Sequence, residues 1–304
     1  MSLKYILLTI SVMFYTIPLY CQNKVYCVLD KTTNQTLPFA TIKFIKAQTG
    51  LYSDAYGKFT IPVNIPKDDS ISISYIGYKP EYYKIEKIND SIFLNQKVEE
   101  LQEIKLTNKK PKNIVFGSSK NMNLSWHIDT NQELAILMKP SNECENCYLN
   151  KINIPISKKT IISDGKNFKM IKPDFNTVFK VNIYSVENEK PSSTSLLKKP
   201  VIINSNQNSP DIISIDISSE FVKFNNRGVF ISIEMIGNID DSQKKILLPL
   251  FRFSRVKTVQ TNSISFYRNV FNTNSWTPIS EITTASKLKK DYNLGIELIV
   301  NKYQ

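Results

Sequence analysis

The sequence contains one histidine, His127, and this scarcity excludes several kinds of active site. A serine–histidine–aspartate triad would have to be built on that single residue. A zinc peptidase centre with two or three histidine ligands cannot be assembled at all. The other residues around His127 offer it no catalytic partner, so we interpret it as a surface residue without a role. We expect no resident metal ion.

Glycine is also scarce, since eight glycines are scattered over 304 residues. None lies in a phosphate-binding loop or in a dinucleotide-binding fingerprint. We therefore expect no nucleotide cofactor, and no cofactor of another kind is indicated.

Arginine is sparse beside lysine, although the formal net charge is +12. Arginine is the side chain that grips phosphates with two parallel hydrogen bonds. The lysines are spread along the chain except at Lys105, Lys109, Lys110 and Lys112. Nucleic-acid binding needs a clustered basic patch, so we expect no nucleic-acid partner. Weak attraction to anionic glycans or lipid headgroups fits better, including peripheral contact with an outer membrane.

Long apolar runs are absent except near the N-terminus, at residues 5–17. A run of about 13 residues is too short to span a bilayer and is typical of a signal peptide. We expect residues 1–21 to be this signal peptide, with cleavage after Cys21. Lipid attachment to Cys21 is the alternative, which Leu19 and Tyr20 disfavour, and an uncleaved anchor is a third. Each predicts an exported protein, in the periplasm, on the outer-membrane surface or outside the cell.

Three cysteines follow the expected cleavage point: Cys27, Cys144 and Cys147. In an oxidising compartment Cys144 and Cys147 could close a small disulfide loop, or they could remain free thiols. A thioredoxin-like role would require a βαβ setting, and a zinc knuckle would require a second pair of ligands. Neither is present. Cys27 lies in a strand pattern and is expected to fill apolar space.

Residues 23–107 form a first module of short predicted strands separated by turns. The segment 71–76 alternates strictly between apolar and polar residues, which predicts a strand with one buried face. Asp54 can cap a tight turn, and Gly57 can supply the positive φ that such a turn needs. Gly77 marks a bend after the alternating strand. Many short strands at this spacing indicate a β-sandwich.

Four segments in this module resemble one family: residues 37–42 (LPFATI), 53–59 (SDAYGKF), 74–78 (SYIGY) and 101–104 (LQEI). Together they are similar to the carboxypeptidase-like regulatory domain. This resemblance implies a seven-stranded, Ig-like (transthyretin-like) sandwich, common in exported proteins of Bacteroidetes, without peptidase activity. Tyr26 departs from the glycine that the family usually has.

Residues 108–120 are polar and basic, and we expect them to be a linker to a second module at residues 121–304. At least eight strands are predicted there, among them 178–184, 228–236 and 294–300. Residues 133–138 could form a helix, but Pro140 and the neighbouring strand patterns favour a strand. The module should be a second, jelly-roll-like β-sandwich, and it is similar to the corresponding half of the same secreted proteins. The expected fold class is all-β.

The candidate binding residues are Tyr267, Arg268 and Trp276, because sugar sites combine aromatic rings with polar groups. The alternative is that Trp276 plugs one end of the core. The adjacent acids 99–100 and 240–241 are interpreted as solvated turns. We expect a non-catalytic exported module of the bacterial envelope that binds or assembles with an envelope protein or a glycan. The alternatives are a glycan-binding accessory protein and, less favoured, a glycoside hydrolase with two carboxyl groups in a cleft.

Overall fold

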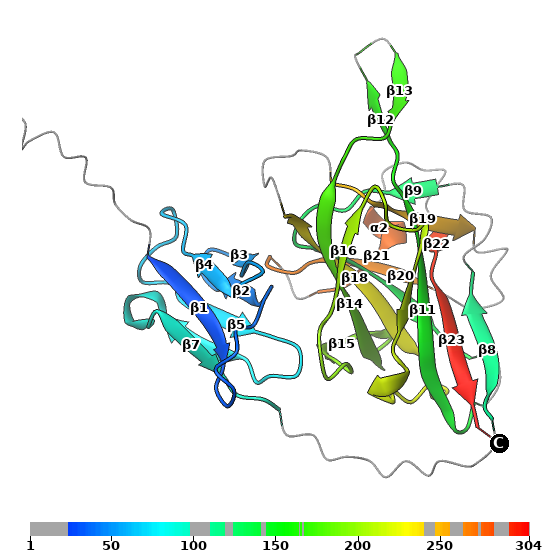
Figure 1. Ribbon diagram of the computed structural model, residues 1–304, viewed down its shortest axis with the longest axis horizontal. Helices are drawn as coiled ribbons and strands as arrows, with labels where there is room; N and C mark the ends of the chain where they lie inside the picture. Colours follow the sequence, from blue (N-terminus) through cyan, green and yellow to red (C-terminus); the bar gives the residue numbers. More distant parts are fainter. Residues whose placement is uncertain are drawn as a thin grey trace, which may run out of the picture.

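The computed structural model describes residues 24–97, 110–118, 124–140, 144–163, 165, 167–239, 247–255, 264–272, 275–282 and 292–303 (Figure 1). The expected signal peptide at 1–21 lies outside the described residues. So do the acid pairs 99–100 and 240–241 and the family-like segment 101–104.

The N-terminal module contains two packed sheets. One has the strand order β4-β1-β7 and the other the order β3-β2-β5-β6. Their bounds are β1 (Val25–Asp30), β2 (Thr41–Phe44), β3 (Thr49–Tyr52), β4 (Lys58–Thr60), β5 (Ser70–Ser74), β6 (Glu81–Lys84) and β7 (Ser91–Leu94), with the short 3-10 helix η1 (Ile85–Lys87). Strands β1 and β7 run parallel, and the other pairs are antiparallel.

Alternation along the strands builds the core of this module. Val28, Ile71 and Ile73 are fully buried between the two sheets. At the β3–β4 turn, Asp54 Oδ1 accepts hydrogen bonds from the backbone N–H groups of Tyr56 and Lys58, both at 2.8 Å. Gly57 follows with φ of 74°. Asp54 and Gly57 thus lie in the tight turn where the sequence places them.

The C-terminal module is a second sandwich of two seven-stranded sheets. The β14 sheet has the order β15-β14-β18-β10-β20-β21, with β16 also paired to β14. The β11 sheet has the order β22-β19-β11-β23-β8, with β17 on β11 and β9 on β19.

The β14 sheet comprises β10 (Gln132–Met138), β14 (Asn176–Glu187), β15 (Lys190–Ser195), β16 (Val201–Asn206), β18 (Val229–Asn238), β20 (Ser265–Asn269) and β21 (Thr277–Pro278). The β11 sheet comprises β8 (Lys112–Gly117), β9 (Leu124–Trp126), β11 (Cys147–Ser157), β17 (Ile212–Asp216), β19 (Leu250–Arg255), β22 (Tyr292–Leu294) and β23 (Glu297–Lys302). Two short helical segments, η2 (Ser218–Glu220) and α2 (Ile279–Ile282), complete the described elements of the module.

The two sheets enclose one continuous apolar core. Phe179 of the β14 sheet meets Phe251 of the β11 sheet edge to face, with ring centroids 5.4 Å apart. The predicted all-β class, with an Ig-like sandwich followed by a second sandwich, is confirmed. Residues 132–138 form strand β10 rather than a helix, because alternate side chains along it enter this core.

Two boundaries differ from the sequence prediction. Lys112–Gly117, within the expected linker 108–120, forms the edge strand β8 along β23. Ile114 and Phe116 pack against the core, so this part of the lysine-rich stretch 108–120 gains one apolar face. The segment 294–300, expected as one strand, is divided between β22 and β23, with Gly295 and Ile296 at the corner.

A two-stranded hairpin, β12 (Thr160–Ser163) and β13 (Phe168–Ile171), projects from the end of β11, at the top of Figure 1. Within the described ranges, no helix has the length and apolar character needed to cross a membrane.

Candidate functional site

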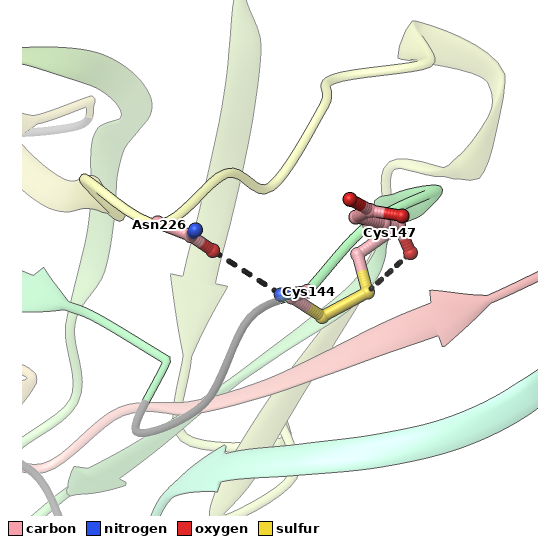
Figure 2. Close-up of a disulfide and its surroundings, with 4 residues drawn as sticks. Cys144, Cys147 and Asn226 are labelled. Carbon is pink, nitrogen blue, oxygen red and sulfur yellow. Dashed lines mark hydrogen bonds between the residues drawn. A yellow bond between two sulfur atoms is a disulfide. The ribbon is translucent and has the colours of Figure 1, made fainter.

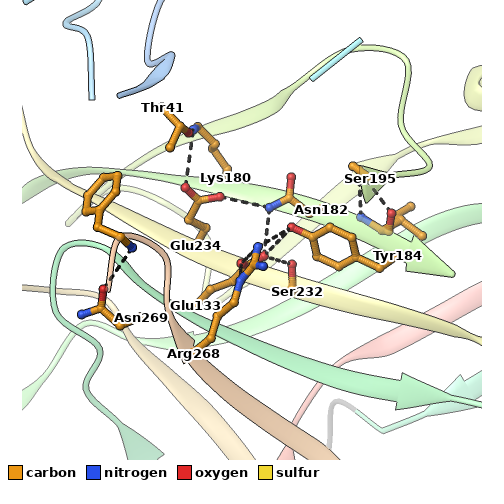
Figure 3. A network of polar contacts seen from close by, with 12 residues as sticks. Thr41, Glu133, Lys180, Asn182, Tyr184, Ser195, Ser232, Glu234, Arg268 and Asn269 are labelled. Atoms are coloured by element: carbon orange, nitrogen blue, oxygen red, sulfur yellow. Dashed lines mark hydrogen bonds and ion pairs between the residues drawn. The ribbon is translucent and has the colours of Figure 1, made fainter. Parts of the chain in front are cut away.

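Four charged side chains form one row across four adjacent strands of the β14 sheet. Lys180 on β14 lies opposite Glu234 on β18, and Glu234 lies opposite Glu133 on β10. Glu133 in turn lies opposite Arg268 on β20. The row therefore reads positive, negative, negative, positive, and Figure 3 shows its side chains converging. We call these four residues the charged row.

Glu133 is fully buried and accepts hydrogen bonds on both carboxylate oxygens. Its Oε2 is 2.6 Å from both Nε and Nη2 of Arg268. Its Oε1 accepts from Asn182, Tyr184 and Ser232 at 3.0, 2.9 and 2.5 Å. A buried charge is tolerated only when it is paired and hydrogen-bonded in this way.

Glu234 is held ionised by its neighbours. Burial opposes its charge, but the Lys180 ammonium, the nearby Tyr52 hydroxyl and the other donors outweigh burial and lower its pKa. Lys180 Nζ lies 3.5 Å from Glu234 Oε1. The Tyr52 hydroxyl and Glu234 Oε1 lie close without meeting the geometry of a hydrogen bond. Burial, and then the Glu234 charge, raises the pKa of Tyr52 well above its usual range.

One donor joins the two carboxylates. Asn182 Nδ2 donates to Glu133 Oε1 and also to Glu234 Oε2, the latter at 3.2 Å. Two convergent carboxyl groups are what a glycoside hydrolase requires, but its general acid must carry a proton and therefore needs a raised pKa. The lowered pKa of Glu234 is the opposite condition. Glu234 therefore does not meet the condition for a general acid.

The outer face of the β14 sheet is covered by the N-terminal module. Lys180 Nζ donates to Thr41 Oγ1 at 3.1 Å and lies 4.6 Å from the ring centroid of Tyr52. The Tyr52 ring also packs on Phe271, with centroids 5.1 Å apart. Gly50 is required beside this contact, because a Cβ there would lie 2.4 Å from the Phe271 ring. The charged row is therefore part of the contact between modules.

A cleft runs along this contact and contains two adjoining cavities of about 220 and 570 Å³. Both are lined by residues 75–78, Lys97 and Pro200. The smaller cavity reaches the charged row and is also lined by Thr41, Ser74, Pro80, Lys180, Asn182, Tyr184, Ser193, Thr194, Ser195, Glu234, Arg268 and Val270. The larger is also lined by Asp30, Gln35, Thr36, Leu37, Gln96, Lys198 and Lys199.

Gly77 sits at a close approach of the two modules in this cleft. Its φ is 82°, and an added Cβ would lie 2.2 Å from the backbone oxygen of Lys198. The bend predicted from the sequence is thus also a point at which only glycine fits between the modules.

Asp30 forms a second buried polar centre, in the larger cavity. Its carboxylate accepts hydrogen bonds from the Tyr78 hydroxyl, the Gln96 side chain and the backbone N–H groups of Thr32 and Thr33. The hydrogen bond from Tyr78, followed by that from Thr33, lowers the pKa of Asp30 far below its usual range. Burial and the Asp30 contact raise the pKa of Tyr78 to about 12.

We expect Tyr78→Phe to destabilise the protein at pH 7 by about 1.5–3 kcal/mol, the usual value of a hydrogen bond to a charged group. Because the folded-state pKa of Asp30 is depressed, its contribution is present above the unfolded-state pKa near 3.9 and is lost as the pH falls below it. Urea midpoints at pH 7 and pH 3 should therefore differ less for Asp30→Asn than for the unaltered protein. Equal pH dependence of the two proteins would contradict this assignment.

The three sugar-binding candidates do not form one exposed surface. Trp276 is 4% exposed, and the Arg268 guanidinium lies over its ring at 4.3 Å. Arg268 faces Glu133, whereas Tyr267, next to it on β20, packs against the inter-sheet core. Trp276 lies in a small apolar cluster with Tyr184, Phe230 and Phe266, apart from the inter-sheet core, so its ring is not exposed for stacking on a sugar. The sequence pattern could not show this because it does not reveal which loop covers the outer face.

Cys144 and Cys147 form a disulfide at the start of β11 (Figure 2). The backbone N–H of Cys144 donates to Asn226 Oδ1 at 3.2 Å, which ties this loop to the turn before β18. Cys27 is a free thiol and is half-buried on β1, so it is less enclosed than an apolar filler.

A thiol titration of the chain beginning at Gln22 should detect one thiol per molecule when unfolded without reductant, because only Cys27 is free. After reduction it should detect all three cysteines that follow Cys21. Three thiols before reduction would show that the 144–147 bond does not form.

His127 is about one-third exposed, and its Nε2 lies 3.4 Å from Asp129 on the surface. No cluster of three or more potential metal ligands occurs among the residues that the structure describes. The charged row is the feature that sequence reasoning missed. The sequence did contain an indication of it, because Lys180, Glu133 and Glu234 are charged residues within the most apolar strands of the second module.

Comparison with known proteins identifies the first module. Residues 27–108 match the family of CarboxypepD_reg-like domains. This match confirms the resemblance for the N-terminal module. The similarity of the second half to a jelly-roll domain and a Bacteroidetes source stay predictions. No curated protein is similar enough to match the chain.

Two similar solved structures are of one protein. The structure of the clostridial cysteine protease Cwp84 after propeptide cleavage has a TM-score of 0.40 and 9% identity, over 92% of this chain and 71% of that one. The cysteine protease and lectin-like domains of Cwp84, a surface layer associated protein of Clostridium difficile, give a TM-score of 0.35 and 8% identity, over 88% of this chain and 59% of that one. At these TM-scores the likeness carries no argument about function.

Proposed function

We propose that this chain is a non-catalytic binding module of the bacterial envelope and that its ligand occupies the cleft between the two sandwiches. The observation that carries the proposal is the cleft itself, which both modules line and which reaches Lys180, Glu234 and Arg268 of the charged row. A ligand there contacts both modules at once. Sites between domains are a common place for ligands in proteins.

The proposal of a non-catalytic role is supported by the contacts that the charged groups make with one another. Each carboxylate of the row has a cationic partner, and the Arg268 guanidinium is already engaged by Glu133 and by the Tyr184 hydroxyl. Charged groups that already pair with one another in this way are poorly placed to activate a substrate.

Export is supported by two features of different kinds. The 144–147 disulfide is a bond that persists in oxidising compartments. The apolar run at residues 5–17 is typical of a signal peptide. The chain is therefore proposed to act beyond the inner membrane.

A glycan is the second candidate ligand, favoured by the chemistry of the cleft wall. Hydroxyl groups of Ser74, Ser193 and Thr194 lie there together with the rings of Tyr75 and Tyr78. Hydroxyl donors beside aromatic rings match the polar edges and apolar faces of sugars. Lys97, Lys198 and Lys199 in the larger cavity would favour a sugar that carries acidic groups.

The test is affinity capture from the native envelope, together with a glycan array, using the unaltered chain and a cleft-blocking variant. Thr194→Trp places a large ring at the exposed rim of the smaller cavity. Thr60→Trp is the matched control, because Thr60 is also exposed, on β4, but does not line the cleft. We expect Thr194→Trp to abolish capture and Thr60→Trp to preserve it. Capture that both variants retain would place the site elsewhere.

A further inference from the structure

The β12–β13 hairpin exposes apolar side chains that the rest of the molecule leaves uncovered. Phe168 is 83% exposed, and Ile161 and Met170 are each 62% exposed. The hairpin pairs with no other described strand and projects from the end of the second sandwich (Figure 1). Exposed apolar groups gathered at one projecting point mark an interaction site.

The register places these side chains on both faces of the hairpin. Ile161 lies opposite Met170, and Phe168 is two residues before Met170, so these three share one face. Ile162 lies on the other face, opposite Lys169, and is 38% exposed. A protein partner that docks on one face would leave the other face in water, whereas a bilayer surrounds both.

Three exposed lysines lie on the hairpin or at its base. Lys159, Lys169 and Lys172 are exposed along the hairpin and its base. Lys158 at the base instead pairs with Asp211 at 3.0 Å and anchors the hairpin to the sandwich. Exposed apolar side chains with lysines beside them are complementary to an anionic membrane surface, where each lysine gains attraction from the headgroups.

We propose that the β12–β13 hairpin is a membrane-docking wedge that inserts its apolar side chains at the headgroup boundary of an anionic bilayer. Insertion is shallow, because the outer edges of a two-stranded hairpin carry backbone groups that hydrocarbon cannot satisfy. The lysines remain at the level of the lipid phosphates. This role does not depend on the ligand of the cleft.

The test is co-sedimentation with phosphatidylglycerol vesicles and with phosphatidylcholine vesicles, using the chain from Gln22 to Gln304. We expect binding to phosphatidylglycerol that weakens with added salt. Phe168→Ser combined with Met170→Ser should reduce this binding by about tenfold or more, from the lost burial of two large side chains. The matched control is Val63→Ser with Tyr82→Ser, two exposed residues of the first module.

A second readout reports insertion directly. Tryptophan placed by Phe168→Trp should shift its emission to the blue when phosphatidylglycerol vesicles are added, whereas Tyr56→Trp, exposed in the first module, should not shift. The proposal is overturned if neither vesicle binds, if the double hairpin variant binds as well as the control, or if the Phe168→Trp emission does not move. If the unaltered chain self-associates without binding vesicles, and the hairpin variant no longer self-associates, the hairpin is a protein interface and the proposal is overturned.

Discussion

Replacement of Glu133 by alanine is expected to destabilise the protein by about 3–5 kcal/mol, the usual cost of removing one partner from a buried ion pair. The change leaves the Arg268 guanidinium buried against Trp276 without its carboxylate. It also removes the acceptor of three further hydrogen bonds, from Asn182, Tyr184 and Ser232. Chemical unfolding at pH 7, monitored by near-ultraviolet circular dichroism, measures the loss.

A double variant distinguishes two causes of this destabilisation, an unpaired buried charge and a loss of packing. Glu133→Leu combined with Arg268→Met removes both charges and should recover much of the stability that Glu133→Leu alone loses. Glu281→Ala removes an exposed carboxylate and should change stability by less than about 0.5 kcal/mol. If Glu133→Ala were no more harmful than Glu281→Ala, the charged row would have no structural role.

Phe271→Ala is expected to uncouple the two modules. Phe271 is 1% exposed, although it lies in the loop after β20, because Tyr52 and the backbone at Gly50 cover it from the first module. Truncating a buried phenylalanine costs about 3–5 kcal/mol. Most of that loss should fall on the contact between modules, since Tyr52 loses the ring it packs against.

Calorimetry and small-angle X-ray scattering measure this uncoupling. The unaltered chain should unfold in one transition, whereas Phe271→Ala should show two transitions and a larger radius of gyration. Phe168→Ala removes the same ring from an exposed position and should change neither quantity. An unchanged scattering curve for Phe271→Ala would contradict the role assigned to this contact.

The fold class could be predicted from the sequence because alternation is a local property. Residues 71–76 show the period of two that buries one face of a sheet, and Asp54 and Gly57 mark their turn by chemistry alone. Edge strand β8 escaped prediction because it lies in the lysine-rich stretch 108–120, which resembles a linker, and only pairing with β23 reveals the apolar face of Ile114 and Phe116.

The candidate site could not be predicted in the same way, because it depends on register between distant strands. Glu133 and Glu234 are about 100 residues apart in sequence, yet they are directly opposite across β10 and β18. In the sequence, each interrupts an apolar strand, but the sequence does not show which residues it faces. The row becomes a buried network because the first module covers Lys180 and Trp276 covers Arg268.

Photo-cross-linking from inside the cleft tests the central claim most directly. A photoreactive phenylalanine analogue in place of Thr194 lies at the cleft rim, and the same analogue in place of Tyr82 lies on the exposed surface of β6. After illumination in native envelopes, we predict a discrete covalent adduct from position 194 and none from position 82. Equal labelling at both positions, or no adduct at 194, would contradict binding between the two sandwiches.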